Sequence, residues 1–140
     1  MSEPLYTREI LRLAAITPHV GLLSDADGTG DLRSPTCGSR MRVAVRVDRD
    51  GRIAALGQAV EACAFGQASA SLMGAHAVGR SRANVSEALS QLTSWLNGTR
   101  DDPGDWPGLE NLAPARPKAG RHGAILLPFR TLLAALDAVP

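Results

Sequence analysis

The amino-acid sequence predicts an α+β fold in which a small, mostly antiparallel sheet packs against helices. A period-two pattern over residues 41–47, a turn and a second extended segment together predict a β-hairpin. Segments with helical spacing of apolar residues lie before and after this hairpin. With 140 residues, of which 44% are hydrophobic, the chain can form one compact core, so we expect a single domain over residues 1–140.

The first predicted element is a short amphipathic helix. Thr7 supplies a capping hydroxyl, Glu9 places an acid in the first turn, and Thr17-Pro18 ends the helix. The following segment, 24–35, is polar and rich in glycine, so we expect an exposed loop that leads to Cys37.

The hairpin is the next element. In 41–47 the methionine and valines alternate with Arg42, Ala44 and Arg46, which indicates a half-buried strand. Turn residues at 48–51 then allow 52–60 to return antiparallel.

Two helices are predicted after the hairpin. The segment 66–78 is rich in alanine and serine and ends before Gly79, which can cap a helix C-terminus. Asn84 and Glu87 then resemble a capping box, and leucines 89, 92 and 96 form the buried stripe of the next helix.

The C-terminal part contains a proline- and glycine-rich stretch and one further helix. Residues 100–117 are predicted to form a surface connection. Residues 125–139 have a strongly apolar helical pattern, which tolerates Pro128 if this residue lies in the first turn.

Charge and hydropathy exclude several classes of protein. The 15 basic and 14 acidic residues are spread evenly, so we expect no nucleic-acid partner. No stretch of about 18 apolar residues and no signal-peptide core occur, so we expect a cytoplasmic protein with no membrane contact. Two cysteines in such a chain are expected to remain thiols.

Signatures of catalysis and of calcium binding are incomplete. Asp25, Asp27 and Asp31 resemble a calcium loop, but the twelfth position is Thr36 rather than glutamate, so we expect a solvated loop. The sequence contains no phosphate-binding loop, nucleophile elbow or paired catalytic carboxylates, and we therefore expect a binding protein rather than an enzyme.

The two cysteines are the candidates for metal or sulfur chemistry. Cys37 lies in Ser34-Pro35-Thr36-Cys37-Gly38, where a tight turn can expose the thiol, although a small structural residue is an alternative. Cys63 directly precedes a predicted helix N-terminus, whose partial positive charge favours a thiolate, the soft metal ligand. A buried structural cysteine at the helix start is the alternative for Cys63.

The order of these motifs resembles the IscU/NifU scaffolds on which iron-sulfur clusters are assembled. The Cys37 turn resembles their first block, and the segment around Cys63, with the alanine-serine run 68–71, resembles their second block. Residues 6–11 also resemble their first helix. The resemblance implies a three-stranded sheet, an iron-sulfur cluster or iron held by Cys37 and Cys63, and partners that include a cysteine desulfurase and cluster-accepting proteins.

The sequence departs from this family pattern at two positions. Ser39 stands where the scaffolds carry an aspartate, and Ala124 stands where they carry their third cysteine. His122, two residues before Ala124, could supply a nitrogen ligand to iron or zinc, or it could be a solvated residue at a helix start.

We therefore expect an iron-sulfur scaffold-like or carrier protein whose metal site is formed by Cys37, Cys63 and His122 at one exposed end of the fold. One monomer leaves this site incomplete, so a homodimer or an exogenous thiol could complete it. The alternatives are a degenerate scaffold paralogue that acts in protein interaction or regulation, and a protein that binds zinc through the same residues.

Overall fold

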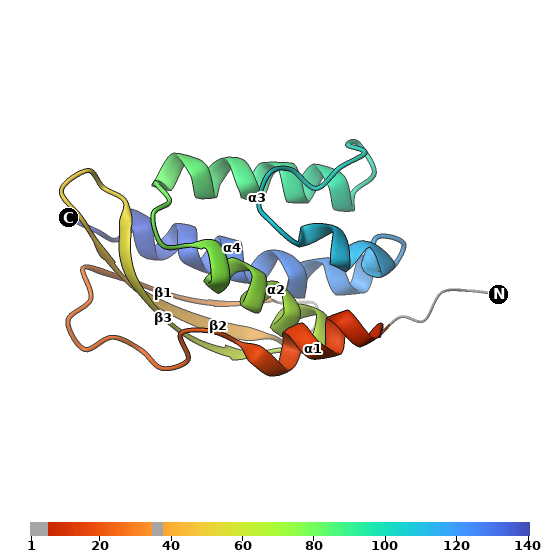
Figure 1. Cartoon of the computed structure of the whole chain (residues 1–140), viewed down its shortest axis with the longest axis horizontal. Helices are drawn as coiled ribbons and strands as arrows, with labels where there is room; N and C mark the ends of the chain where they lie inside the picture. The colour runs from red at the N-terminus through yellow and green to blue at the C-terminus, as the bar shows by residue number, and fades with distance from the viewer. Residues whose placement is uncertain (1–5, 35–37) are drawn as a thin grey trace.

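The computed structural model describes residues 6–34 and 38–140 and confirms the α+β fold (Figure 1). In this part of the chain, three antiparallel strands form one sheet in the order β1-β2-β3. The strands are β1 (Gly28–Arg33), β2 (Arg40–Val47) and β3 (Ile53–Glu61). The helices are α1 (Arg8–Ile16), α2 (Ala64–His76), α3 (Arg82–Leu96) and α4 (His122–Asp137), with short 3₁₀ helices η1 (Leu109–Ala115) and η2 (Ala119–Arg121).

The helices cover one face of the sheet in layers (Figure 1). Helix α4 packs on β1 and β2, and α2 packs on β3 and on α4. Helix α3 packs on α4 and lies farther from the sheet than α4 does. Helix α1 packs along α2, so that α2 lies in the middle of the helical layer.

Strands β2 and β3 form the hairpin that the sequence predicts. In β2 the side chains of Met41, Val43 and Val45 are buried, whereas Arg42 and Arg46 are exposed. The Asp48 carboxylate accepts backbone hydrogen bonds from residues 50 and 52 and so closes the turn.

Strand β1 corrects the prediction of an exposed loop over residues 24–35. Gly28 and Gly30 are buried, and they lie directly beneath the backbone of α4. A methyl group would lie 2.2 Å from the Ala135 carbonyl oxygen at position 28, and 2.5 Å from the Thr131 carbonyl oxygen at position 30. The glycines that suggested a loop are therefore required by close packing of a strand against a helix.

The helix starts agree only partly with the predictions. Thr7 caps α1, since its hydroxyl accepts a hydrogen bond from Ile10 N at 3.1 Å. The cap of α3 is Ser81 rather than Asn84, because Ser81 and Asn84 form a capping box with each other. Helix α2 begins at Ala64, two residues earlier than predicted, with Cys63 as its N-cap.

Helix α4 begins at His122, so Pro128 lies inside the helix instead of in the first turn. Proline has no N–H to donate to the preceding turn. The Ser69 hydroxyl from α2 donates to the nearby Ile125 carbonyl at 2.6 Å, which ties the two helices together in this region.

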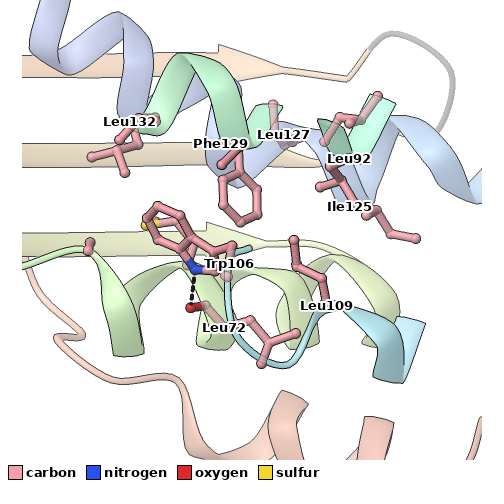
Figure 2. Packing of buried hydrophobic residues seen from close by; sticks show 14 of the residues in the cluster. Leu72, Leu92, Trp106, Leu109, Ile125, Leu127, Phe129 and Leu132 are labelled. Carbon is pink, nitrogen blue, oxygen red and sulfur yellow. Dashed lines mark hydrogen bonds between the residues drawn. The ribbon is translucent and has the colours of Figure 1, made fainter. Parts of the chain in front are cut away.

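Residues 100–117 are not a purely superficial connection. Four of their side chains are buried, namely Trp106, Leu109, Leu112 and Ala115. The Trp106 indole N–H donates to the Leu72 carbonyl at 2.8 Å, and its ring contacts Phe129 edge-on at 5.2 Å (Figure 2). The prolines and glycines bend this segment over α2 while its apolar side chains enter the core.

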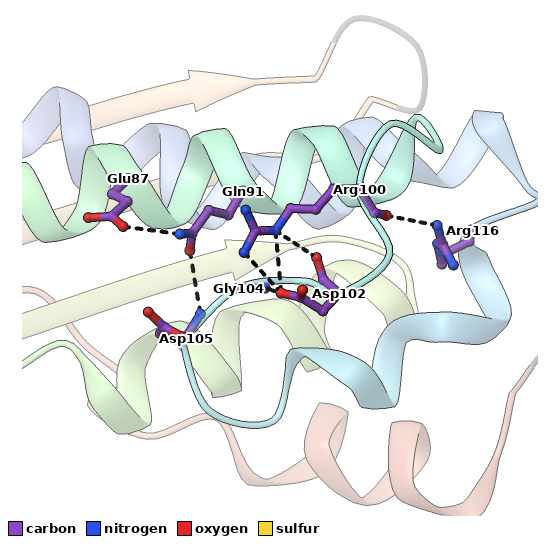
Figure 3. A network of polar contacts seen from close by, with 7 residues as sticks. All are labelled: Glu87, Gln91, Arg100, Asp102, Gly104, Asp105 and Arg116. Carbon is purple, nitrogen blue, oxygen red and sulfur yellow. Dashed lines mark hydrogen bonds and ion pairs between the residues drawn. The ribbon is translucent and has the colours of Figure 1, made fainter.

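A polar network holds this connection to α3 (Figure 3). Gln91 donates to Glu87 and accepts from the Asp105 backbone, and Asp102 pairs with Arg100.

In the described part of the chain, no helix is long and apolar enough to cross a membrane.

Candidate functional site

Cys63 lies where β3 passes into α2, as the sequence predicts. It is the N-cap of α2, with extended backbone angles, and its carbonyl oxygen accepts a hydrogen bond from Gln67 N at 2.9 Å. Its side chain makes no capping hydrogen bond and is a free, partly exposed thiol. A free thiol at the positive end of a helix is suited to bind a soft metal or to accept sulfur.

The second predicted ligand, Cys37, lies outside the described residues. The flanking backbones of Ser34 and Ser39 are joined by a hydrogen bond of 2.8 Å, and Gly38 N donates to Ser34 O at 3.0 Å. Ser39, which replaces the aspartate of the family pattern, is buried.

The strand register places the described residues on either side of Cys37 at the same end of the sheet as Cys63. Arg40, the first residue of β2, is paired with both Arg33 and Glu61, the last residues of β1 and β3. Ser34 and Ser39 therefore lie at the end of the sheet from which the chain leaves β3 toward Cys63.

Ala124, at the position of the missing third cysteine, lies against the first turn of α2. It is fully buried, and a methyl group on Gly66 would lie 3.3 Å from the Ala124 Cβ. The same methyl group would lie only 2.5 Å from the Ala62 Cβ. Position 124 is therefore within van der Waals range of the turn that Cys63 begins, but it carries no donor atom.

His122 lies on a different side of α4. Its Nε2 is 3.0 Å from the Ala115 carbonyl oxygen and 2.9 Å from that of Arg116. Because carbonyl oxygens only accept hydrogen bonds, Nε2 carries the proton, and Nδ1 holds the lone pair of the neutral ring. Two residues correspond to about 200° around a helix, so His122 and Ala124 point in nearly opposite directions.

The structure thus brings Ala124 against the Cys63 turn, while the Nε2 of His122 is held by the carbonyl oxygens of Ala115 and Arg116. Among the residues that the structure describes, no three His, Cys, Asp or Glu side chains form a group that could hold a metal ion. A site that includes Cys37 involves a residue outside this range, and the proposed ligand set remains a prediction.

The aspartates that suggested a calcium loop are engaged with the sheet. Asp31 forms a bidentate ion pair with Arg40, with N–O distances of 2.7 and 3.1 Å. Asp25 forms an ion pair with Arg46 at 3.3 Å. The Arg40 guanidinium holds the pKa of the Asp31 carboxyl below its ordinary value, and the charges of Arg42 and Arg33 act in the same direction.

Gly66 is a further residue of this region, and its role does not follow from the sequence pattern. Gly66 fits between Ala62 and Ala124 and lets α4 approach the first turn of α2. The sign of this role in the sequence is a glycine between the larger residues Phe65 and Gln67, close to the start of a helix.

The fold and the thiol at the head of α2 define a class of small α+β domains of the NifU type. The chain belongs to the NifU-like N terminal domain family, which matches residues 5–99. A comparison with curated protein sequences gives no match.

Solved structures agree with this assignment. The N-terminal NifU-like protein from Brucella abortus, described as nitrogen-fixing, has a TM-score of 0.90 and 26% identity, over 96% of this chain and 94% of that chain. A candidate iron-sulfur cluster assembly scaffold for the SUF system of Fervidobacterium islandicum AW-1 has a TM-score of 0.86 and 20% identity, over 94% and 96% of the two chains. A hypothetical protein has a TM-score of 0.74 and 21% identity, over 95% and 97%. The last two similarities concern the fold alone.

Proposed function

We propose that this chain binds iron or an iron-sulfur cluster as its cargo through Cys63 and Cys37, as a scaffold-like or carrier protein without catalytic activity of its own. The observation that carries the proposal is the free, partly exposed Cys63 thiol at the N-terminus of α2, in a chain of the NifU-like family. A cysteine desulfurase would supply sulfur, and a cluster-accepting protein would receive the cargo.

The donor set fits a labile cargo better than a permanent metal centre. Two thiolates and the Nδ1 of His122 are at most three donors, while tetrahedral iron or zinc takes four. The fourth ligand would come from a partner, a second copy or a small thiol. Weak retention is suited to a protein that passes its cargo on.

The alternative function is a zinc-binding or protein-interaction module that keeps the fold and assembles no cluster. It is favoured by Ala124, which fills the third ligand position with a buried methyl group. The two functions differ in whether iron and sulfide bind together.

The decisive experiment restores a thiol at position 124. Ala124→Cys should increase the iron and sulfide retained after anaerobic reconstitution, because position 124 contacts the first turn of α2. The matched control is Ala135→Cys, at a buried alanine in the last turns of the same helix. Absorbance, iron, sulfide and zinc contents are measured for each variant.

Further variants assign the individual ligands. Cys63→Ala should abolish retention and leave the circular dichroism spectrum unchanged. His122→Gln keeps a donor near the carbonyl oxygens that Nε2 contacts but removes Nδ1, so it should weaken binding only if imidazole is a ligand. If neither wild type nor Ala124→Cys retains iron and sulfide, the cluster function is wrong and the interaction module is favoured.

A further inference from the structure

Strand β3 lies at the edge of the sheet opposite β1, and only part of this edge is covered (Figure 1). The segment 19–21 covers Gln58, since Gln58 N donates to His19 O and Gly21 N donates to Gln58 O, both at 2.9 Å. Because backbone direction alternates along a strand, the N–H and C=O groups of Val60 point to the same side as those of Gln58. Within residues 6–34 and 38–140, no segment outside the sheet hydrogen-bonds to the Val60 backbone, so the described edge of β3 is open at Val60.

A pocket of about 280 Å³ lies beside this open stretch. It is lined by the end of β3, by Thr17 and Val20 of the segment that follows α1, and by Gln67 of α2. Val20 presents an apolar side chain that is 74% exposed and that a bound segment could cover. The volume is near the lower limit of ligand sites, so the pocket can hold one side chain of a segment that lies along the strand.

The walls of this pocket are held in place by hydrogen bonds. Gln58 is fully buried, and its side-chain amide donates to Pro18 O at 2.8 Å and to Ala70 O at 3.2 Å. On the α2 side, the Gln67 amide donates to Ala62 O at 2.9 Å. A site that is already formed costs little ordering when a partner binds.

The open end of β3 carries an acidic residue. Glu61 is exposed and forms no ion pair within residues 6–34 and 38–140. Arg40, its cross-strand partner on β2, is already bound by both oxygens of Asp31. Arg42 lies across from Ala59. Since opposite charges stabilise a cross-strand pair, a residue added at this edge should be basic opposite Glu61 but not opposite Ala59.

The alternation of side chains determines how an added antiparallel strand would lie. Its residue opposite Val60 would point to the helical side of the sheet, as Val60 does, and would enter the pocket. Its preceding residue would lie opposite Glu61 on the open face. The added strand must end or turn away at Gln58, where residues 19–21 cover the edge, and its N-terminal part runs toward Cys63.

We infer that the open edge of β3 binds an extended segment of a partner protein as an added antiparallel strand. The segment carries an apolar residue opposite Val60, preceded by a basic residue opposite Glu61. In strand addition, main-chain hydrogen bonds supply affinity and side-chain pockets supply specificity. The contact brings the partner beside Cys63 but requires no metal, so it stands independently of the proposed function.

An NMR titration of the metal-free, ¹⁵N-labelled full chain with the peptide acetyl-TTRVT-amide tests this site. The amide signals of Val60, Glu61 and Gln67 should shift and saturate at millimolar peptide. Methylation of the valine nitrogen removes the N–H that donates to Val60 O, and should raise the dissociation constant at least about tenfold. The matched control is methylation of the arginine nitrogen, whose N–H points away from β3, and it should leave the dissociation constant unchanged.

A charge swap then tests the basic position. Glu61→Arg should weaken binding of acetyl-TTRVT-amide and strengthen binding of acetyl-TTEVT-amide, whereas Glu110→Arg, at an exposed glutamate of η1, should change neither. The protein spectrum shows whether each variant is folded, and the two methylated peptides test the wild type without any substitution. The absence of saturable shifts, equal effects of the two methylations, or an unchanged preference in folded Glu61→Arg would each overturn the inference. Shifts of Val60 and Gln67 that depend on protein concentration without peptide would overturn it too, because a second copy would then occupy the edge.

Discussion

Substitution of Gly66 by alanine should destabilise the protein, although alanine is the better helix former. At an unhindered helical position, alanine would be more stable than glycine by about 0.5–1 kcal/mol. Here the new methyl group would lie 2.5 Å from the Ala62 Cβ and 3.3 Å from Ala124, while carbon atoms pack best at about 3.5–4.0 Å. Overpacking of this kind costs about 1–3 kcal/mol, so we expect the free energy of unfolding to fall by that amount.

Urea unfolding followed by circular dichroism measures this effect. Gly120→Ala is the control, because a methyl group there has no atom within 4 Å, and its stability should equal or slightly exceed that of the wild type. Combining Gly66→Ala with Ala62→Gly removes the shortest contact and should restore most of the loss. A Gly66→Ala protein as stable as the wild type would refute the close packing around Gly66, where Ala62 makes the shortest contact and Ala124 of α4 lies 3.3 Å from the new methyl group.

Three further predictions concern the cap, the core and the sheet surface. Ser81→Ala should lower the free energy of unfolding by about 1 kcal/mol by removing the α3 capping box, whereas the exposed Ser90→Ala in the same helix should not; thermal denaturation compares them. Gln58 is fully buried, and its amide donates to two backbone carbonyls. Gln58→Glu should therefore be strongly destabilising at pH 8 and less so at pH 5, because burial raises the pKa of the new carboxyl. The midpoints of urea unfolding at the two pH values measure this difference. Arg40→Gln should raise the pKa of Asp31 toward its ordinary value in an NMR titration, and an unchanged pKa would contradict the assigned cause. The pKa of Asp31 is lower in the folded than in the unfolded protein. Its ion pair with Arg40 therefore stabilises the wild type above the unfolded pKa of about 3.9, and this stabilisation is lost as the pH falls through the folded pKa.

Local patterns in the sequence predicted the elements whose cause is local. The alternation over 41–47 predicted β2 because Met41, Val43 and Val45 are buried on one face, while on the other face the arginines are exposed and only the small Ala44 is buried. The hydroxyl of Thr7 predicted the start of α1 because a cap acts within one turn. Cys63 at the strand-to-helix junction was predicted for the same reason, since the change of periodicity lies within a few residues of it.

The missed features depend on contacts between distant segments. Gly28 and Gly30 read as a loop because the backbone of α4, which makes them necessary, lies about 100 residues away in the chain. Trp106 lies among prolines and glycines in the sequence, and it is a core residue because of contacts with distant segments, among them its hydrogen bond to Leu72 and its ring contact with Phe129. The candidate site has the same character, because the approach of position 124 to Gly66 joins two helices that no local pattern relates.

The two glycines of β1 also determine the distance between α4 and the sheet. Because positions 28 and 30 have no side chain, the backbone of α4 lies in close contact with β1. This close contact also determines where the first residues of α4 lie relative to the Cys63 turn. The size of the residues at positions 28 and 30 of β1 therefore influences the position of residue 124 at the other end of α4. An alanine at position 28 would collide with the Ala135 carbonyl, so we expect it to tilt α4 and to change the separation of positions 63 and 124 without altering either residue.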